Sequence, residues 1–255
     1  MPDVEEPDPS ERPIIAFFDV DNTLLRGASI FHVGFGAFRK GIISPRDIAL
    51  FAWHQIRFLR VGENQQHLAV ARKKALGLAE GKTVKQVVDL ANEIWDRTIS
   101  RKLWPESVEL AREHLRKGHE VWLITATPQL VAQVIADRLG LTGALGTVAE
   151  EVDGVFTGQL VGAVMHGDHK AEAAGDLAAS MNANLEDCWA YSDSSNDIPL
   201  LTLVGNRVVV NPDASLARHA ASENWAVLQL KTASIREARK RVRREARAVK
   251  KKRQP

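Results

Sequence analysis

Cysteine is nearly absent from the sequence, and so are long apolar runs. The single cysteine, Cys188, excludes a disulfide bond within the chain and favours a reducing compartment. No stretch reaches the roughly 18 consecutive apolar residues of a transmembrane helix. Residues 1–13 are acidic and rich in proline, so the sequence predicts no signal peptide. We therefore expect a cytoplasmic protein without a membrane span.

The remaining composition is that of an ordinary globular protein. Of the 255 residues, 45% are hydrophobic and 26% are charged. This length and this composition allow one large domain or two smaller ones with a buried core.

The formal net charge of +2 conceals a strongly basic C-terminal segment. Residues 231–255, called here the basic tail, contain 12 lysines and arginines but only two acidic residues. Residues 1–230 hold 22 basic and 30 acidic residues, a formal net charge of −8. A thin apolar stripe at helical spacing predicts that the tail is solvated and partly helical. The alternative is weak contact of the tail with an anionic membrane or a nucleic acid.

Strand and helix patterns alternate over most of the sequence. Apolar and β-branched runs predict strands at 14–19, 121–124, 187–191 and 207–210. Helical spacing of apolar residues predicts helices at 107–117, 128–139 and 171–181. Asp153-Gly154 predicts a β-hairpin over 152–156. The alternation is typical of an α/β fold with a doubly wound, Rossmann-like parallel sheet.

Residues 28–104 interrupt this alternation, because they contain helical patterns but no convincing strand. We interpret them as a helical cap inserted after the first strand. The expected organisation is a disordered leader, a core in two parts, the cap and the basic tail, at residues 1–12, 13–27 with 105–230, 28–104 and 231–255.

Two carboxylates stand at the end of the first predicted strand, on Asp19 and Asp21. Because side chains alternate along a strand, both carboxylates face the same side. Two like charges at this spacing repel each other unless a cation, a proton or a reaction uses them. Ligands of open α/β sheets bind at the carboxyl ends of strands. The pair therefore predicts a chemically active site.

Three further signals lie at the ends of later elements. Thr125 closes the second predicted strand before a helix N-terminus, where a hydroxyl and free N–H groups suit a phosphate oxygen. Lys170 begins another helix and offers a compact positive charge, and Asp193 and Asp197 follow the next strand. Several carboxylates with one lysine indicate a hard divalent cation such as Mg²⁺.

Each of these signals has a simpler alternative when taken alone. Thr125 could be a helix N-cap, and Lys170 could be an ordinary surface lysine. His166 and His169 suggest a metal site, but no cysteine or third histidine lies near them in the sequence. Glycine-rich runs at 34–36 and 77–83 lack a preceding strand, so they do not match nucleotide-binding loops.

Taken in order along the chain, the motifs resemble those of the haloacid dehalogenase superfamily, in particular its phosphoserine phosphatase-like branch, subfamily IB. The D-x-D-x-T motif matches residues 19–23, the strand ending in a hydroxyl residue matches Thr125, and the lysine matches Lys170. The acidic loop G-D-x-x-N-D matches residues 192–197, with Ser192 in place of glycine. One D-x-D-x-T motif is weak evidence, whereas four motifs in order are specific.

The resemblance implies a Mg²⁺-dependent phosphatase that acts on a small phosphorylated substrate. Asp19 would be the nucleophile that forms an aspartyl-phosphate, and Asp21 would be the general acid and base. The Asp19 and Asp193 carboxylates and the backbone carbonyl of Asp21 would hold the metal. The remaining roles would be phosphate binding by Thr125, Ala126 and Lys170, and orientation of the metal ligands by Asn196 and Asp197.

One position argues against the substrate of the phosphoserine phosphatases themselves. Those enzymes have a glutamate five residues after the threonine of the first motif, which binds the substrate ammonium, and here that position is Ala28. The missing charge-assisted contact is worth about 1.5–3 kcal/mol. We therefore expect another substrate, such as a phosphorylated alcohol or a lysolipid phosphate. The alternatives are a true phosphoserine phosphatase, phosphoryl transfer to an acceptor other than water, and a lipid-phosphate phosphatase or anionic-surface-binding protein that uses the basic tail.

Overall fold

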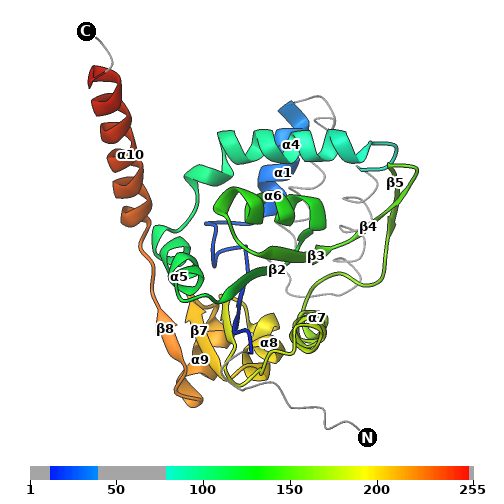
Figure 1. The fold of residues 1–255 in the computed structure, drawn as a ribbon, viewed down its shortest axis with the longest axis vertical. Coiled ribbons are helices and arrows are strands. Elements are labelled where there is room, and N and C mark those ends of the chain that lie inside the picture. The colour runs from blue at the N-terminus through cyan, green and yellow to red at the C-terminus, as the bar shows by residue number, and fades with distance from the viewer. Residues whose placement is uncertain (1–11, 40–78, 253–255) are drawn as a thin grey trace, which may run out of the picture.

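A computed structural model of the chain describes residues 12–39 and 79–252 (Figure 1). Most of the predicted leader and the middle of the predicted cap lie outside the described residues, so the division into leader, core, cap and tail stays a prediction. The described part consists of a central sheet, helices on both of its faces, a β-hairpin and a long C-terminal helix.

Six parallel strands form the central sheet, in the order β3-β2-β1-β6-β7-β8. Their bounds are β1 Ile15–Phe18, β2 Glu120–Pro128, β3 Gly143–Thr147, β6 Trp189–Ser192, β7 Asn206–Val210 and β8 Ala226–Leu228. The predicted α/β fold with a doubly wound parallel sheet is confirmed. The chain passes from β1 to β2 and β3 on one side and then to β6 on the other, so the strand order reverses at β1. Ligands of open α/β sheets bind outside the carboxyl ends of the strands at such a point.

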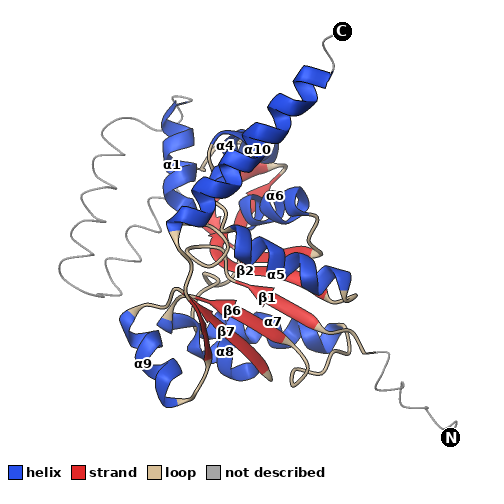
Figure 2. Ribbon diagram, turned by 90° about the vertical axis from the view of Figure 1, so that its left-hand side faces the viewer, coloured by secondary structure: helices blue, strands red, loops and turns tan. Residues whose placement is uncertain are grey.

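Helices cover both faces of the sheet (Figure 2). Alternate side chains of β1 enter opposite cores, because neighbouring residues of a strand point to opposite faces. Ala16 and Phe18 belong to the core that includes residues of α5 (Pro105–Arg116) and α6 (Gln129–Leu139). Ile15 and Phe17 belong to the core that includes residues of α7 (Asp168–Ser180), α8 (Ile198–Leu203) and α9 (Ala214–Ser222). Burial on both faces explains why the strand is apolar throughout.

The described parts of the predicted cap are helical. The helix α1 (Ser29–Arg39) begins soon after β1, and α4 (Val84–Arg97) packs against α1 and α6. Thr83 starts α4 with a capping box, in which its hydroxyl accepts from the Gln86 N–H and its own N–H donates to Gln86 Oε1, at 3.2 and 2.9 Å. A short 3₁₀ turn, η2 (Ile99–Arg101), leads back toward α5.

The predicted β-hairpin is confirmed. The strands β4 (Ala149–Val152) and β5 (Val155–Leu160) pair in antiparallel fashion. Asp153 and Gly154 form the turn with φ angles of 52° and 76°, which aspartate and glycine tolerate better than most residues.

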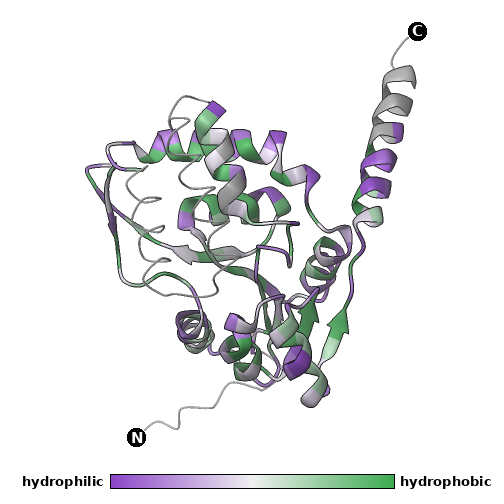
Figure 3. Cartoon of the chain, turned by 180° about the vertical axis from the view of Figure 1, so that it is seen from behind, coloured by the Kyte–Doolittle hydropathy of each residue, from purple (hydrophilic) through white to green (hydrophobic). Residues whose placement is uncertain are grey.

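Within the basic tail, the helix α10 (Thr232–Lys252) extends away from the sheet (Figures 1 and 3). Its first turn contacts α5: Ile235 is buried, and the Ser234 hydroxyl donates to Glu106 Oε2 at 3.1 Å. Farther along, the Val242 side chain is 60% exposed. Among residues 12–39 and 79–252, no helix has both the length and the apolar character to cross a membrane.

The second strand is longer than predicted. The sequence predicts that Thr125 closes it and that Pro128 lies in the following helix, whereas β2 extends to Pro128 and α6 begins at Gln129. The physical reason is pairing beyond a register shift, where Pro128 lies opposite Thr147 of β3 and the Thr147 hydroxyl donates to the Ala126 carbonyl at 2.9 Å. Thr125 and Thr127 are therefore buried, at 1% and 3% exposed.

Candidate active site

The predicted site residues come together at the carboxyl ends of three neighbouring strands. Asp19 follows β1 directly, and its backbone N–H donates to the Tyr191 carbonyl of β6 at 2.9 Å. Asp193 follows β6, and Thr125 lies near the end of β2. Lys170 reaches the same place from the first turn of α7. The site therefore lies at the reversal of strand order.

A buried lysine links two of the predicted carboxylates. Lys170 Nζ donates to Asp19 Oδ1 and to Asp197 Oδ2, at 2.7 Å each. The Ser192 hydroxyl also donates to Asp197 Oδ2, at 2.6 Å. All three charged side chains are at most 7% exposed. Burial alone would lower the pKa of the Lys170 ammonium, but Asp19 and Asp197 raise it well above its ordinary value, so Lys170 is charged.

The carboxylates outnumber the positive charge beside them. Burial raises the pKa of the Asp19 carboxyl most, Lys170 opposes this, and Asp197, Asp193 and Asp21 raise it again. Burial is also the main cause that raises the pKa of Asp193 to about 7. Such a group of carboxylates favours a bound cation, because a second positive charge would stabilise their ionised forms.

Asp21 has a different partner from Asp19. Its Oδ1 accepts the backbone N–H of Ser29, the first residue of α1, at 2.7 Å. Burial raises the pKa of Asp21, and hydrogen bonds from the backbone and the side chain of Ser29 lower it. Asp21 is thus held by Ser29 at the start of the predicted cap, whereas Asp19 is held by Lys170 of the core.

Asp193 is positioned by the loop after β1 and by the N-cap of α9. Its carboxylate accepts from the Thr23 hydroxyl at 3.4 Å and forms a hydrogen bond with the Asn22 side chain. Its backbone carbonyl accepts the N–H of Asp213, the N-cap of α9, at 2.9 Å. Asp213 Oδ2 in turn accepts the Ser195 N–H at 2.7 Å, so the acidic loop is tied to α9 at two points.

Three buried hydroxyls connect β2 with the start of α1. Thr125 Oγ1 donates to Thr127 Oγ1 at 3.0 Å, and Thr127 Oγ1 lies 2.6 Å from Ser29 Oγ. These three residues, called here the hydroxyl chain, are each at most 3% exposed. Ala126 lies between the two threonines and is exposed. The predicted phosphate site thus adjoins the residue that holds Asp21.

The donor set fits Mg²⁺ in its chemistry. Among residues 12–39 and 79–252, no three His, Cys, Asp or Glu side chains are arranged to hold a metal ion by themselves. The predicted ligands are two carboxylates and one backbone carbonyl, and Mg²⁺ commonly keeps several waters beside few protein oxygens. Asn196 lies in the same acidic loop, where its Nδ2 donates to Ser194 Oγ at 3.2 Å, and its predicted role in orienting the metal ligands stays a prediction.

Sequence reasoning assigned no role to four residues of the site. Ser29, Thr127, Ser192 and Asn22 each hydrogen-bond a predicted site residue or its partner. Isolated hydroxyl and amide residues carry little signal in a single sequence. The signals that could have found them are the positions of Thr127 two residues after Thr125 and of Ser192 directly before Asp193.

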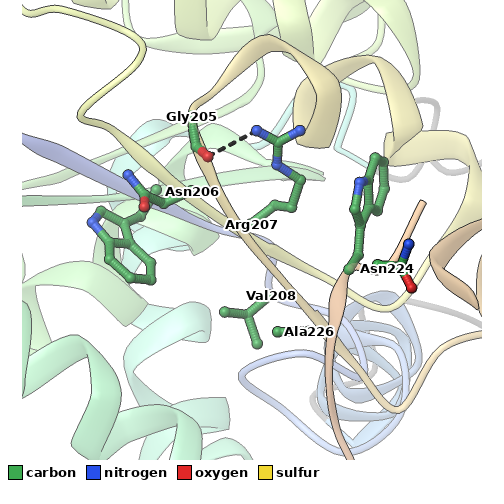
Figure 4. A pocket seen from close by; sticks show the side chains of 8 residues that line it. Gly205, Asn206, Arg207, Val208, Asn224 and Ala226 are labelled. Carbon is green, nitrogen blue, oxygen red and sulfur yellow. Dashed lines mark hydrogen bonds between the residues drawn. The ribbon is translucent and has the colours of Figure 1, made fainter.

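The hollow shown in Figure 4 lies elsewhere. It has a volume of about 350 Å³ and is lined from the amino ends of β6, β7 and β8, opposite the predicted site. The Arg207 guanidinium donates to the Val204 and Gly205 carbonyls at 2.5 and 2.8 Å and lies 5.6 Å from the centre of the Trp225 ring. Arg207 therefore supports the loop between α8 and β7.

Comparisons with known proteins agree on one family. A family model described as haloacid dehalogenase-like hydrolase matches residues 16–202. A Mycobacterium tuberculosis protein named phosphoserine phosphatase SerB1 is 48% identical over 226 residues, which cover 88% of this chain and 73% of that protein. A Neisseria meningitidis histidinol-phosphatase is 28% identical over 222 residues, which cover 85% and 99%. A solved structure of a Bordetella pertussis protein of unknown function matches with a TM-score of 0.75 and 27% identity, covering 85% and 98%.

Proposed function

The chain belongs to the haloacid dehalogenase-like hydrolase family and is a phosphatase of the phosphoserine phosphatase-like kind; we propose that it hydrolyses phosphomonoesters through an aspartyl-phosphate on Asp19. The observation that carries this proposal is the buried Asp19 carboxylate at the reversal of strand order, with one oxygen held by Lys170 at 2.7 Å. A fixed nucleophile beside a cation is well placed to attack an anionic phosphoryl group.

The first step transfers the phosphoryl group to the enzyme. An Asp19 carboxylate oxygen forms a bond to phosphorus while the bond between phosphorus and the alcohol oxygen breaks. Asp21 gives its proton to the departing alkoxide, and the raised pKa of Asp21 favours the protonated form that this step needs. The products are an aspartyl-phosphate and the free alcohol.

The second step releases phosphate and restores the enzyme. The Asp21 carboxylate takes a proton from a water molecule, whose oxygen attacks phosphorus as the bond to the Asp19 oxygen breaks. Lys170 stays charged between Asp19 and Asp197 and, with the Thr125 hydroxyl and the Ala126 N–H, would bind the phosphoryl oxygens.

Mg²⁺ would be held by the Asp19 and Asp193 carboxylates and the Asp21 carbonyl, and it would supply positive charge where carboxylate and phosphate meet. Asp197 and the acidic loop would keep these groups in place. Asp197 does so through its hydrogen bonds to Lys170 and Ser192. Asn196 would act only through the loop that contains it.

The proposed substrate is a phosphorylated alcohol other than phosphoserine. Ala28 offers no carboxylate for a substrate ammonium, and Ser29 next to it is committed to Asp21 and Thr127. The relatives' names differ in substrate, since one is a phosphoserine phosphatase and another a histidinol-phosphatase. The alternative, a true phosphoserine phosphatase, is favoured by the 48% identity to SerB1.

The test is phosphate release from a panel of phosphomonoesters by the wild-type protein and by Asp19→Asn. We expect Mg²⁺-dependent release by the wild type, lost on chelation, with phosphoserine not the preferred substrate. Asp19→Asn removes the nucleophile and should lower turnover on the order of 10⁴-fold or more.

Asp153→Asn is the matched control, because it makes the same chemical change at an exposed turn whose positive φ asparagine also tolerates. It should keep wild-type turnover. Persistent activity in Asp19→Asn would refute the covalent mechanism, and a strong preference for phosphoserine would refute only the substrate assignment. Alcohol release that exceeds phosphate release would indicate transfer to an acceptor other than water.

A further inference from the structure

The hydroxyl chain ends at the proposed general acid. Thr127 is joined to Ser29 by a hydrogen bond of 2.6 Å, and Ser29 donates its N–H to Asp21 Oδ1 at 2.7 Å. The Ser29 side chain also hydrogen-bonds Asp21. Ser29, Thr125 and Thr127 are 1%, 1% and 3% exposed, so water does not compete for these hydroxyls.

The direction of donation follows from the acceptor at the end of the chain. The oxygen of Asp21 that faces Ser29 accepts hydrogen bonds both when the carboxyl is ionised and when its proton lies on the other oxygen, so the Ser29 hydroxyl donates to Asp21. Ser29 Oγ must then accept from Thr127, which lies 2.6 Å away. Thr127 Oγ1 in turn accepts from the Thr125 hydroxyl at 3.0 Å. Each hydroxyl therefore donates to the next, and Thr127 fixes the orientation of Ser29.

We propose that Thr127 is a positioning residue for Asp21 and acts through Ser29. This inference rests on the proposed function, because it assumes that Asp21 protonates the leaving group. Ser29 is the first residue of α1, so the same contact also joins the start of the predicted cap to β2. Without the Thr127 hydroxyl, Ser29 would lose its donor, and the Asp21 carboxyl would no longer be held in one orientation.

A purely structural role for Thr127 makes a different prediction. Loss of a buried hydroxyl could loosen the whole site, and it would then slow every substrate alike. Poor placement of a general acid slows only those reactions in which the leaving group needs a proton. The dependence of the rate on the leaving group therefore separates the two roles.

The experiment compares kcat/KM for 4-nitrophenyl phosphate, whose leaving group needs little protonation, with kcat/KM for glycerol 3-phosphate, an alkyl phosphate. In Thr127→Val, which replaces the hydroxyl with a methyl group of similar size, we expect kcat/KM for the alkyl phosphate to fall about 10-fold or more. The value for the aryl phosphate should change by less than about 3-fold. Ser29→Ala should change the ratio in the same direction, because it keeps the N–H but removes the intermediate hydroxyl.

Two controls make the result specific. Thr127→Ser restores the hydroxyl and should restore the wild-type ratio. Thr147→Val removes another buried hydroxyl, one that bonds the Ala126 carbonyl and the Met165 N–H and lies outside the chain of donors, so it should leave the ratio unchanged. Thermal unfolding of each variant without metal checks that it is folded.

If kcat/KM changed by the same factor for both substrates in Thr127→Val, their ratio would be unchanged. This result would overturn the inference but would not contradict the proposed phosphatase function. If Thr127→Val does not fold, the ratio measured in Ser29→Ala decides in the same way. A wild-type protein that hydrolyses neither ester, or an Asp19→Asn variant that still does, refutes the proposed function and this inference with it.

Discussion

Asp19 and Asp21 lie two residues apart, yet their carboxylates have different partners. Asp19 is paired with the Lys170 ammonium, which favours its ionised form against the larger effect of burial, which raises its pKa. Asp21 accepts from the neutral groups of Ser29, and burial raises its pKa. Under the proposed function, the difference in partner, rather than the spacing, distinguishes the carboxylate that attacks from the one that transfers a proton.

Another buried titratable group, the imidazole of His114, lies on the core side of β6. The His114 ring is 4% exposed, with Nε2 2.8 Å from the Tyr191 hydroxyl and Nδ1 2.8 Å from His119 Nδ1. Burial, with smaller effects from His119 and Lys117, lowers the pKa of His114 to about 4. We expect the free energy of unfolding to decrease as the pH falls from about 6.5 to about 4. In this range the His114 ring binds a proton in the unfolded chain but not in the folded chain.

His114→Gln tests this expectation by urea unfolding across that pH range. The variant removes the titrating ring, so its unfolding free energy should depend less on pH, by up to about 1.4 kcal/mol per pH unit. His169→Gln, which changes an exposed histidine, is the comparison. Equal slopes for the wild type and His114→Gln would show that other groups cause the acid sensitivity.

The proposed catalytic and binding residues were predictable from the sequence, but the residues that support them were not. Asp19, Lys170 and Asp193 stand at element ends in a fixed order, and that order identifies the family. Ser29 and Thr127 are ordinary hydroxyl residues, 98 positions apart, whose contact depends on how α1 meets β2. No local pattern contains that information.

Two glycines in or beside the helices differ in the space available for a side chain. Gly205 links α8 to β7, its N–H donates to the Leu185 carbonyl at 2.9 Å, and a Cβ there would collide with the Glu186 backbone. Gly175 lies inside α7 with nothing within 4 Å of an added Cβ. We expect Gly205→Ala to destabilise the protein by about 1–3 kcal/mol and Gly175→Ala to stabilise it by about 0.5–1 kcal/mol.

Chemical denaturation of the two variants measures this difference, and each serves as the control for the other. The substitution is the same, so side-chain chemistry cannot explain opposite signs. If both variants lost stability, an added methyl group would be harmful regardless of local space, and the argument from the Glu186 contact would be wrong.

The elements with strong periodic patterns were predicted, and those shaped by neighbours were missed. The segment Gly143-Ala-Leu-Gly-Thr147 has weak strand propensity, but it forms β3 by pairing with β2. Trp122 of β2 occupies the space above Gly143, 2.6 Å from where a Cβ would be. The strand β8 has three residues at the edge of the sheet, too few to show a period. In both cases tertiary contacts decide the structure.

At the scale of the whole molecule, positive charge is concentrated in the C-terminal helix and negative charge in the rest of the protein. The core that carries the site is acidic, whereas α10 extends from α5 with a strongly basic sequence (Figure 1). The described first part of α10 presents exposed basic residues around an exposed Val242, a composition that suits the interface of an anionic membrane. We expect α10 to bring the phosphatase to such a surface without taking part in the chemistry.

Four exposed basic residues of α10 provide the test, each changed to glutamine, which keeps a high helix propensity. They are Arg236, Arg239, Lys240 and Arg244. At about 1 kcal/mol for each charge near the surface, binding to vesicles of phosphatidylserine and phosphatidylcholine should weaken 100-fold or more. Turnover of a water-soluble phosphomonoester should not change.

A second variant separates a specific contact from general loss of positive charge. It carries four glutamines at exposed basic positions of the cap and core, namely Lys85, Arg101, Arg112 and Arg116. Because the change in net charge is equal, only the place of the charges differs, and this variant should keep the wild-type affinity for vesicles. Equal weakening in both variants would mean that net charge alone drives the binding. Tight, salt-sensitive binding to duplex DNA without binding to vesicles would assign α10 to nucleic acid instead.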